Sequence, residues 1–350
     1  MAGAVLGAHG RVRALRSLRD TARDLDYRFR TLTERVRFGR CPTVHALPDI
    51  YHYWSNRYLR PKLEAFGTSH PEAFFLKYLD RCRRDGGGDS RRFLSIGAGD
   101  CDIEIGLAVA LAKLDGPAFV IECLDVNRAV LERGRAKAAA AGVADHIAIA
   151  PVDLNRWRPT VRYDAVIANQ SLHHIVALEP LFDGVAASLA PHGLFIVSDM
   201  IGRNGHKRWP EALAIVDEFW RELPDTHRVD RQRRKQHRDY PDVDYASRGF
   251  EGIRAQDILP LLVERFAFDV FIGFANAIDP FVDRSFGPNF SVERDWDRDF
   301  IDRVHARDEA AILSGAITPT HMLAALCAGR AGENRFADGL SPQSAVRRPD

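Results

Sequence analysis

The chain has 350 residues, of which 46% are hydrophobic and 28% charged, and its formal net charge is +1. This is the composition of an ordinary globular protein, and the balanced charge gives no case for a nucleic-acid-binding or membrane-surface protein. No apolar run reaches the roughly 20 residues that span a bilayer. The five cysteines have no Cys-x-x-Cys spacing, which argues against a zinc site or a disulfide framework and favours a cytoplasmic protein.

An arginine-rich segment comes first. Over residues 11–38 apolar side chains recur at three- and four-residue spacing, which predicts an amphipathic helix within a basic N-terminal segment, 1–45. Its charged face indicates solvent exposure, or a helix that joins two copies into a homodimer, and an RNA- or lipid-binding arm is the alternative. Residues 46–90 then hold an aromatic run (51–58) and the start of a further helix at Pro71.

The turn Gly97-Ala98-Gly99 follows a short apolar strand and precedes an apolar helix that begins at Asp102. Glycines let a ligand approach the backbone, and strand, turn and helix in this order form a nucleotide-binding corner of a parallel α/β sheet. The dinucleotide fingerprint needs a third glycine where Asp102 stands, and Asp100 adds a second acid. Two negative charges disfavour a pyrophosphate, whereas a nucleoside with a cationic or zwitterionic tail is tolerated. S-adenosylmethionine (SAM) is the commonest such ligand on this fold.

Further motifs follow the turn in order. A second strand ends at Asp125-Val126, a third at Asp153-Leu154 and a fourth at Asn169. Asp125 is placed to accept hydrogen bonds from ribose hydroxyls, and Asp153 can accept one from the adenine amino group. With these motifs, residues 91–200 resemble the SAM-binding core of the class I SAM-dependent methyltransferases.

That resemblance implies a Rossmann-like, seven-stranded, doubly wound α/β sheet that is mostly parallel and has an antiparallel last strand. It implies SAM as the cofactor and S-adenosylhomocysteine as the product. The acid that often precedes the first glycine in this family is Ser95 here, so Asp100 becomes the candidate partner of the methionine amine. The expected cofactor contacts are Gly97, Ala98, Gly99, Asp100, Asp125, Val126, Asp153, Leu154 and Asn169.

The resemblance also suggests roles for the flanking segments. Residues 46–90 are expected to form a helical lid over cofactor and substrate, or simply to pack against the sheet edge. Residues 201–330 are expected to supply substrate-side helices and an antiparallel strand pair, and 331–350 a disordered tail. The candidate substrate contacts are Tyr51, Tyr53, Asp199, Asn204, His206 and Trp209.

Two histidines just after the fourth strand are the candidate catalytic residues. His173 and His174 lie where the transferable methyl is expected, and an imidazole suits the removal of a proton from an acceptor. The sequence therefore favours methylation of a small molecule, with oxygen as the acceptor atom, and predicts no metal site. An RNA methyltransferase that uses the basic N-terminal helix and the arginines of 228–238, or a scaffold without turnover, are the alternatives.

Overall fold

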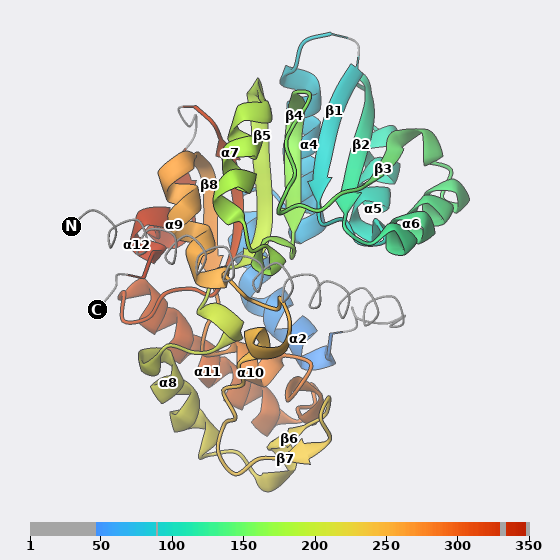
Figure 1. The fold of residues 1–350 in the computed structure, drawn as a ribbon. Helices are drawn as coiled ribbons and strands as arrows, with labels where there is room; N and C mark the ends of the chain where they lie inside the picture. The colour runs from blue at the N-terminus through green and yellow to red at the C-terminus, as the bar shows by residue number, and fades with distance from the viewer. Residues whose placement is uncertain (1–46, 89, 330–333, 348–350) are drawn as a thin grey trace, which may run out of the picture.

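The computed structural model describes residues 47–88, 90–329 and 334–347 (Figure 1). The predicted basic N-terminal segment, 1–45, and its proposed dimer contact lie outside these residues. An eight-stranded sheet organises the described chain. Its strands are β1 (Ser90–Ile96), β2 (Ala118–Asp125), β3 (Ile147–Pro151), β4 (Tyr163–Asn169), β5 (Leu189–Met200), β8 (Ala267–Phe274), β9 (His321–Cys327) and β10 (Arg335–Phe336).

The strand order is β10-β8-β9-β5-β4-β1-β2-β3. β1 pairs in parallel with β2 and β4, β2 with β3, and β4 with β5. β9 lies between β5 and β8 and is antiparallel to both, as expected for the last strand pair. The predicted doubly wound, mostly parallel sheet is confirmed, with eight strands rather than seven because β10 adds to the edge beside β8.

Helices cover both faces of this sheet (Figure 1). The α-helices are α2 (Asp49–Trp54), α3 (Arg60–Glu64), α4 (Pro71–Asp85), α5 (Asp102–Ala112), α6 (Arg128–Ala140), α7 (Leu178–Ser188), α8 (Pro210–Trp220), α9 (Ala255–Arg265), α10 (Asp279–Val282), α11 (Asp295–Leu313) and α12 (Pro342–Ala345). Short 3₁₀ turns are η2 (Ala144–His146), η3 (Leu172–His174), η4 (Asn204–His206), η5 (Asp225–His227), η6 (Tyr245–Arg248), η7 (Gly287–Asn289) and η8 (Ala337–Gly339), and η1 (Ser55–Leu59) is a π-helical turn.

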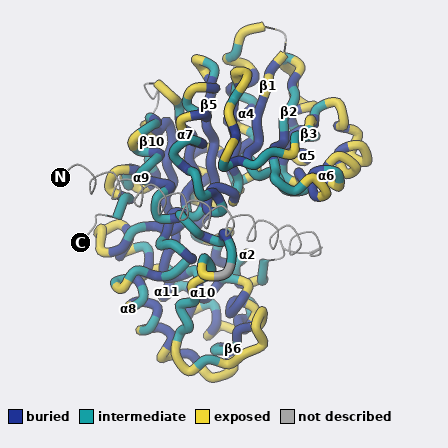
Figure 2. The backbone as a smooth tube through the Cα atoms, in the orientation of Figure 1, coloured by how far each residue is buried: buried dark blue, intermediate teal, exposed yellow. Residues whose placement is uncertain are grey.

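The hydrophobic core is divided by the sheet, because successive side chains of a strand point to opposite faces. In β4, Ala165 and Ile167 belong to the cluster under α4, α5 and α6, whereas Val166 and Ala168 belong to the cluster under α7 and α9. Both faces of the central strands are therefore apolar, which explains why they read as continuous hydrophobic runs. Figure 2 shows these strands buried and the exposed residues on outer helices and loops.

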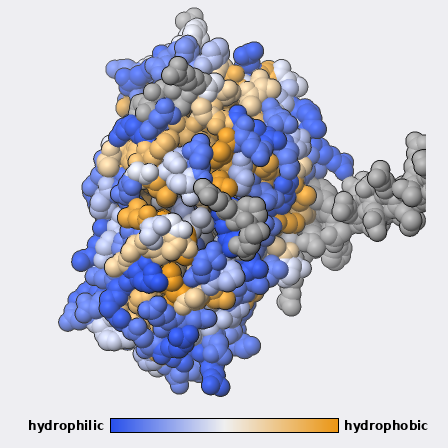
Figure 3. Space-filling view, turned by 90° about the vertical axis from the view of Figure 1, so that its left-hand side faces the viewer, coloured by the Kyte–Doolittle hydropathy of each residue, from blue (hydrophilic) through white to orange (hydrophobic). Residues whose placement is uncertain are grey.

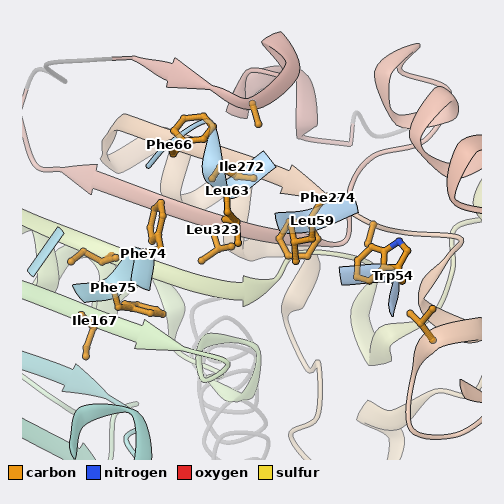
Figure 4. Packing of buried hydrophobic residues seen from close by; sticks show 14 of the residues in the cluster. Trp54, Leu59, Leu63, Phe66, Phe74, Phe75, Ile167, Ile272, Phe274 and Leu323 are labelled. Carbon is orange, nitrogen blue, oxygen red and sulfur yellow. The ribbon is translucent and has the colours of Figure 1, made fainter. Parts of the chain in front are cut away.

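Residues 49–64 form one nearly continuous helical segment that packs on the sheet. Leu59 and Leu63 lie against the strands that hold Ile272 and Leu323 (Figure 4). The π-helical turn η1 ends two residues before Pro61, which has no N–H to donate to the preceding turn, so the regular helical hydrogen bonding is interrupted there. The segment is thus part of the core, and whether it also closes over a ligand stays a prediction.

The C-terminal residues 334–347, expected to lie in a disordered tail, instead form β10, η8 and α12. The reason is apolar packing that the Gly- and Pro-rich composition obscures, since Ala345 is buried in the cluster under α9. Arg347 also places its guanidinium 4.0 Å from the centre of the Trp209 ring and bonds to Glu211 at 3.0 Å.

The region beyond the carboxyl edge of the sheet holds α8, α10, α11 and a hairpin of β6 (Val229–Asp230) and β7 (Lys235–Gln236). On the face seen in Figure 3, the lowest part of the molecule is mostly hydrophilic. Residues 231–236 are exposed or half-exposed, which agrees with a solvated insertion. Among the described residues, no helix is both long and apolar enough to cross a bilayer.

Phe75 offers a test of this packing. Its side chain is fully buried under the sheet (Figure 4), so Phe75→Ala is expected to lower the free energy of unfolding by about 3–5 kcal/mol. Leu313→Ala, at a side chain that is 51% exposed, should change it by no more than about 0.5 kcal/mol. Denaturant unfolding of both variants measures the difference, and equal losses would contradict the assignment of Phe75 to the core.

Candidate functional site

The glycine turn lies between β1 and α5, at the carboxyl edge of the sheet. Gly97 and Gly99 have φ of +69° and +55°, values that side chains rarely tolerate. The N–H groups of Gly97 and Ala98 donate to the carbonyl of Leu124 at 2.9 and 3.0 Å, which fixes the turn to the end of β2. A Cβ on Gly97 would lie 2.6 Å from the Cβ of Ser171, whereas one on Gly99 would meet nothing within 4 Å. One side of the turn is thus closely packed and the other is open.

Asp125, at the end of β2, is held beside this turn. Its Oδ2 accepts the N–H of Gly99 at 3.1 Å, and its Oδ1 accepts that of Asn127 at 2.7 Å. A carboxylate can accept several hydrogen bonds, so this position can also receive hydroxyl groups of a sugar. The predicted neighbour Val126 is half-buried.

The remaining predicted cofactor residues lie at the ends of the next two strands. Asp153 follows β3 and accepts the N–H of Asn155 at 3.1 Å, and Leu154 beside it is buried. Asn169 ends β4, opposite Ser198 of β5. The fold therefore brings the sequence motifs to one edge of the sheet, and their cofactor contacts stay predictions.

Asp100 is already engaged by another side chain. Lys137 of α6 places its Nζ 2.7 Å from Asp100 and 2.6 Å from Asp102, so both acids face α6. Burial works against the charged form of Asp100, but the hydrogen bond and charge of Lys137 outweigh it and hold the pKa of this carboxyl below its usual range. A contact from Asp100 to the amine of a ligand would compete with this pairing.

Glu104 is a residue that the motif search passed over. It lies in the first turn of α5, is only 3% exposed, and accepts a hydrogen bond from the hydroxyl of Ser95 at 2.5 Å. Burial raises the pKa of Glu104 to about 7. A carboxyl group therefore does stand beside Ser95, but it comes from the helix and not from the strand. Glu104 stands between Ile103 and Ile105 in the sequence, and no motif marks it.

His173 is locked in place by a buried carboxylate. Asp199 of β5 is fully buried, and its Oδ1 lies 2.6 Å from Nδ1 of His173. Burial alone would lower the pKa of His173, but the charge and hydrogen bond of Asp199, with a further contribution from Glu251, raise it to about 10. Asp199, expected among the substrate contacts, is instead a positioning residue, because it has no exposed surface to offer a ligand.

Glu251 gathers three imidazoles around its carboxylate. Its Oε1 lies 2.8 Å from Nε2 of His206 and 3.5 Å from Nε2 of His173, and its Oε2 lies 3.8 Å from Nε2 of His174. Burial opposes ionisation, but bonds from His173 and His206 hold the pKa of Glu251 well below its usual range. We refer to His173, His174, His206 and Glu251 as the histidine–glutamate cluster.

His174 differs from its neighbour in charge. Its ring lies 4.1 Å from the ring of His173, and its side chain is 27% exposed. Burial and the positive charge of His173 lower the pKa of His174 to about 4. Near neutral pH the cluster thus contains a protonated and an uncharged imidazole side by side. Glu251 was missed in the sequence because its polar surrounding segment carries no motif.

The other predicted substrate residues do not join this cluster. Tyr53 donates to Asp302 of α11 at 3.0 Å, and the guanidinium groups of Arg203 and Arg347 flank the ring of Trp209. Tyr51 is half-buried, and burial together with the charge of Asp279 raises its pKa to about 12.

Asn204 exchanges hydrogen bonds with Gln256 of α9, at 3.2 Å in each direction. It therefore serves to connect two segments of the chain. Of the predicted substrate contacts, only His206 belongs to the histidine–glutamate cluster.

No family model matches the chain, and no curated protein matches its sequence. Among solved structures, the chain is similar to an O-methyltransferase of a trans-AT PKS multienzyme of Brevibacillus brevis in complex with S-adenosyl-L-homocysteine. The identity is 14%, the TM-score 0.40, and the match covers 73% of this chain and 70% of that one. It is also similar to geranyl diphosphate C-methyltransferase from Streptomyces coelicolor A3(2), at 10% identity and TM-score 0.41, over 74% of this chain and 79% of that one. With values this low, any function must be argued from the residues of this chain.

Glu104 makes the stability of the fold depend on pH. Below about pH 4.5 the carboxyl group of Glu104 is protonated in both folded and unfolded chains, so the folded chain does not have to bury a charge and is at its most stable with respect to this group. As the pH rises from 4.5 to about 7, the unfolded chain ionises while the folded one keeps its proton, so this contribution to stability is progressively lost. Glu104→Gln removes the titration and keeps an acceptor for Ser95.

The difference in unfolding free energy, variant minus wild type, is therefore expected to rise by a few kcal/mol, roughly 1.4 kcal/mol per unit of pKa shift, between pH 4.5 and 7 and then to level off. Denaturant titrations at several pH values measure it. A difference that stays flat over this range would show that Glu104 ionises normally.

Proposed function

We propose that this chain is a SAM-dependent methyltransferase that acts on a small molecule. The observation that carries the proposal is the convergence, at one sheet edge, of an open glycine turn, the carboxylate of Asp125 and the histidine–glutamate cluster. Ser171 links them, because it contacts Gly97 and its hydroxyl donates to the carbonyl of Ile96 at 2.7 Å. Ligands of open α/β sheets bind at this edge.

The turn suits an adenosyl sulfonium better than a diphosphate. The space beside Gly99 can admit a ligand, and Asp125 stands ready for ribose hydroxyls. Lys137 offsets only one of the two negative charges of Asp100 and Asp102, so the start of α5 keeps a net negative charge that would disfavour a pyrophosphate. In this proposal the backbone of 97–99 cradles the cofactor, and Asp153 and Leu154 contact adenine. Bound there, SAM supplies an electrophilic methyl group.

The cluster is proposed to orient and deprotonate the methyl acceptor. His174 is uncharged near neutral pH and half-exposed, so it can accept a proton from an acceptor hydroxyl. His173 is held between Asp199 and Glu251 through its two ring nitrogens, and its ring lies against that of His174, so it positions the base. Oxygen is therefore the proposed acceptor atom. Much of the rate would come from holding the two reacting atoms in line.

No observation favours the RNA alternative among the described residues. Several arginines of 228–238 are used within the fold: Arg231 bonds to Asn289 at 2.5 Å, and Arg233 pairs with Asp230 at 3.2 Å. The basic N-terminal helix on which that alternative depends lies outside the described residues.

Cofactor binding can be tested without knowledge of the acceptor. By titration calorimetry, Asp125→Asn is expected to weaken SAM binding by about 10- to 100-fold, since a charge-assisted hydrogen bond contributes roughly 1.5–3 kcal/mol. Asp145→Asn, an exposed residue on the loop before β3, is the matched control and should bind as the wild type does. Equal affinities of the two variants would remove Asp125 from the site, and absence of SAM binding to the wild type would refute the proposed function.

The proposed base can be tested once an acceptor is in hand. A panel of hydroxylated small molecules is screened for transfer of the tritium-labelled methyl group from SAM by the wild type. His174→Ala is then expected to slow transfer by about 10²- to 10⁴-fold and to leave SAM affinity unchanged. His192→Ala, at an exposed histidine of β5, serves as the control. An unchanged rate in His174→Ala would exclude this residue as the base.

A further inference from the structure

We propose that His173, His206 and Glu251 form a binding site for a divalent transition-metal ion. One ligand atom from each residue lies within 4.8 Å of the other two. Ligand atoms that surround a zinc ion at about 2.0–2.2 Å are roughly 3.3 Å apart in a tetrahedral site. The separations of Glu251 Oε1 from the two Nε2 atoms, 2.8 and 3.5 Å, bracket that value. The three donor atoms are therefore close enough for one ion to contact all of them.

Backbone hydrogen bonds hold the three donor segments together. The N–H of Gly205 donates to Gly252 at 2.9 Å, and that of Ile253 donates to the carbonyl of His173 at 3.0 Å. His206 has a φ of +56°, and a Cβ on Gly252 would lie 2.9 Å from its ring. The close approach of the ring to a glycine fixes its direction. The main chain thus holds the segments that carry the three residues next to one another.

Asp199 completes the site as a second-layer residue. Metal-binding histidines commonly donate their other ring nitrogen to a carboxylate, which fixes the tautomer and the ring orientation. Asp199 Oδ1 lies 2.6 Å from Nδ1 of His173, so Nε2 is the nitrogen directed at Glu251. The carboxylate of Asp199 is itself held by the N–H groups of Ser171, Leu172 and Met200, at 2.7–2.9 Å.

Charge balance and access favour a cation of this kind. A bound ion would displace the proton that His173 carries in the ion-free chain, since a metal-binding imidazole must be neutral. Asp199 and Glu251 then give the site two negative charges, which a divalent ion neutralises. Glu251 is 38% exposed and His206 14% exposed, so an ion can enter and keep an open position for water or another oxygen ligand. Two imidazoles and one carboxylate suit Zn²⁺, Co²⁺ or Fe²⁺ better than Mg²⁺ or Ca²⁺, which prefer oxygen ligands.

This inference departs from the sequence-based expectation of no metal site. Its ligands come from three segments far apart in the chain, so no spacing motif could reveal them. Metal binding requires neither SAM nor methyl transfer, and its test is separate from that of the proposed function. Whether or not the chain transfers methyl groups, the ion would lie beside His174.

The test uses the full-length protein, purified without a polyhistidine tag, treated with a chelator and titrated with Zn²⁺ by calorimetry. One ion per chain is expected, with micromolar or tighter affinity. Co²⁺ in its place should give the visible absorption of a four- or five-coordinate ion. Glu251→Gln and His206→Ala should each weaken Zn²⁺ binding at least tenfold, and Asp199→Asn by about 10- to 100-fold. His192→Ala should bind as the wild type does.

Circular dichroism checks that each variant is folded. Because Glu251 is half-exposed, Glu251→Gln is not expected to disturb the packing of the core. Absence of Zn²⁺ binding to the wild type, or binding that is unchanged in folded Glu251→Gln and His206→Ala, would overturn the proposal. Zinc binding without SAM binding would support this site and refute the methyltransferase. SAM binding without zinc binding would do the reverse.

Discussion

The buried carboxylate of Asp199 is the constraint on which the described site depends. A fully buried charge is strongly destabilising unless hydrogen bonds and an opposite charge surround it. Asp199 obtains them from the main chain after β4, from its own strand and from His173. These bonds determine the path of the loop from Ser171 to His174. Ser171 in turn contacts Gly97, so one side chain of β5 connects the histidine–glutamate cluster with the glycine turn.

The sequence was most informative where local chemistry decides structure. Apolar runs predicted the strands, and glycines predicted the turn that begins after Ile96, because a left-handed backbone favours a residue without Cβ. The acids at the ends of β2 and β3 were then expected to contact a ligand, because ligands of such sheets bind at the carboxyl ends of the strands. The antiparallel pair of β8 and β9, which are far apart in the chain, was expected only from the resemblance to the class I methyltransferases.

What the sequence could not reveal depends on side chains that meet across the fold. Glu104 reads as an ordinary helix residue until its burial beside Ser95 is known. Glu251 lies in a polar segment, and nothing in that segment indicates that three imidazoles surround its carboxylate. Tyr53 and Trp209 were plausible ligand contacts by residue type, yet Asp302 and Arg347 engage them. Composition likewise concealed α12, because a few small apolar residues suffice to dock one helical turn.

The two-residue strand β10 has a practical consequence. It pairs with β8 through Arg335 and Phe336, and α12 packs against α9 behind it, so these residues cover what would otherwise be the open edge of the sheet. Unpaired edges invite pairing with a second molecule and aggregation. A chain shortened after residue 329 would leave Val270 and Phe271 of β8 without this neighbour, and it is expected to aggregate more readily than the full chain for reasons unrelated to its ligands.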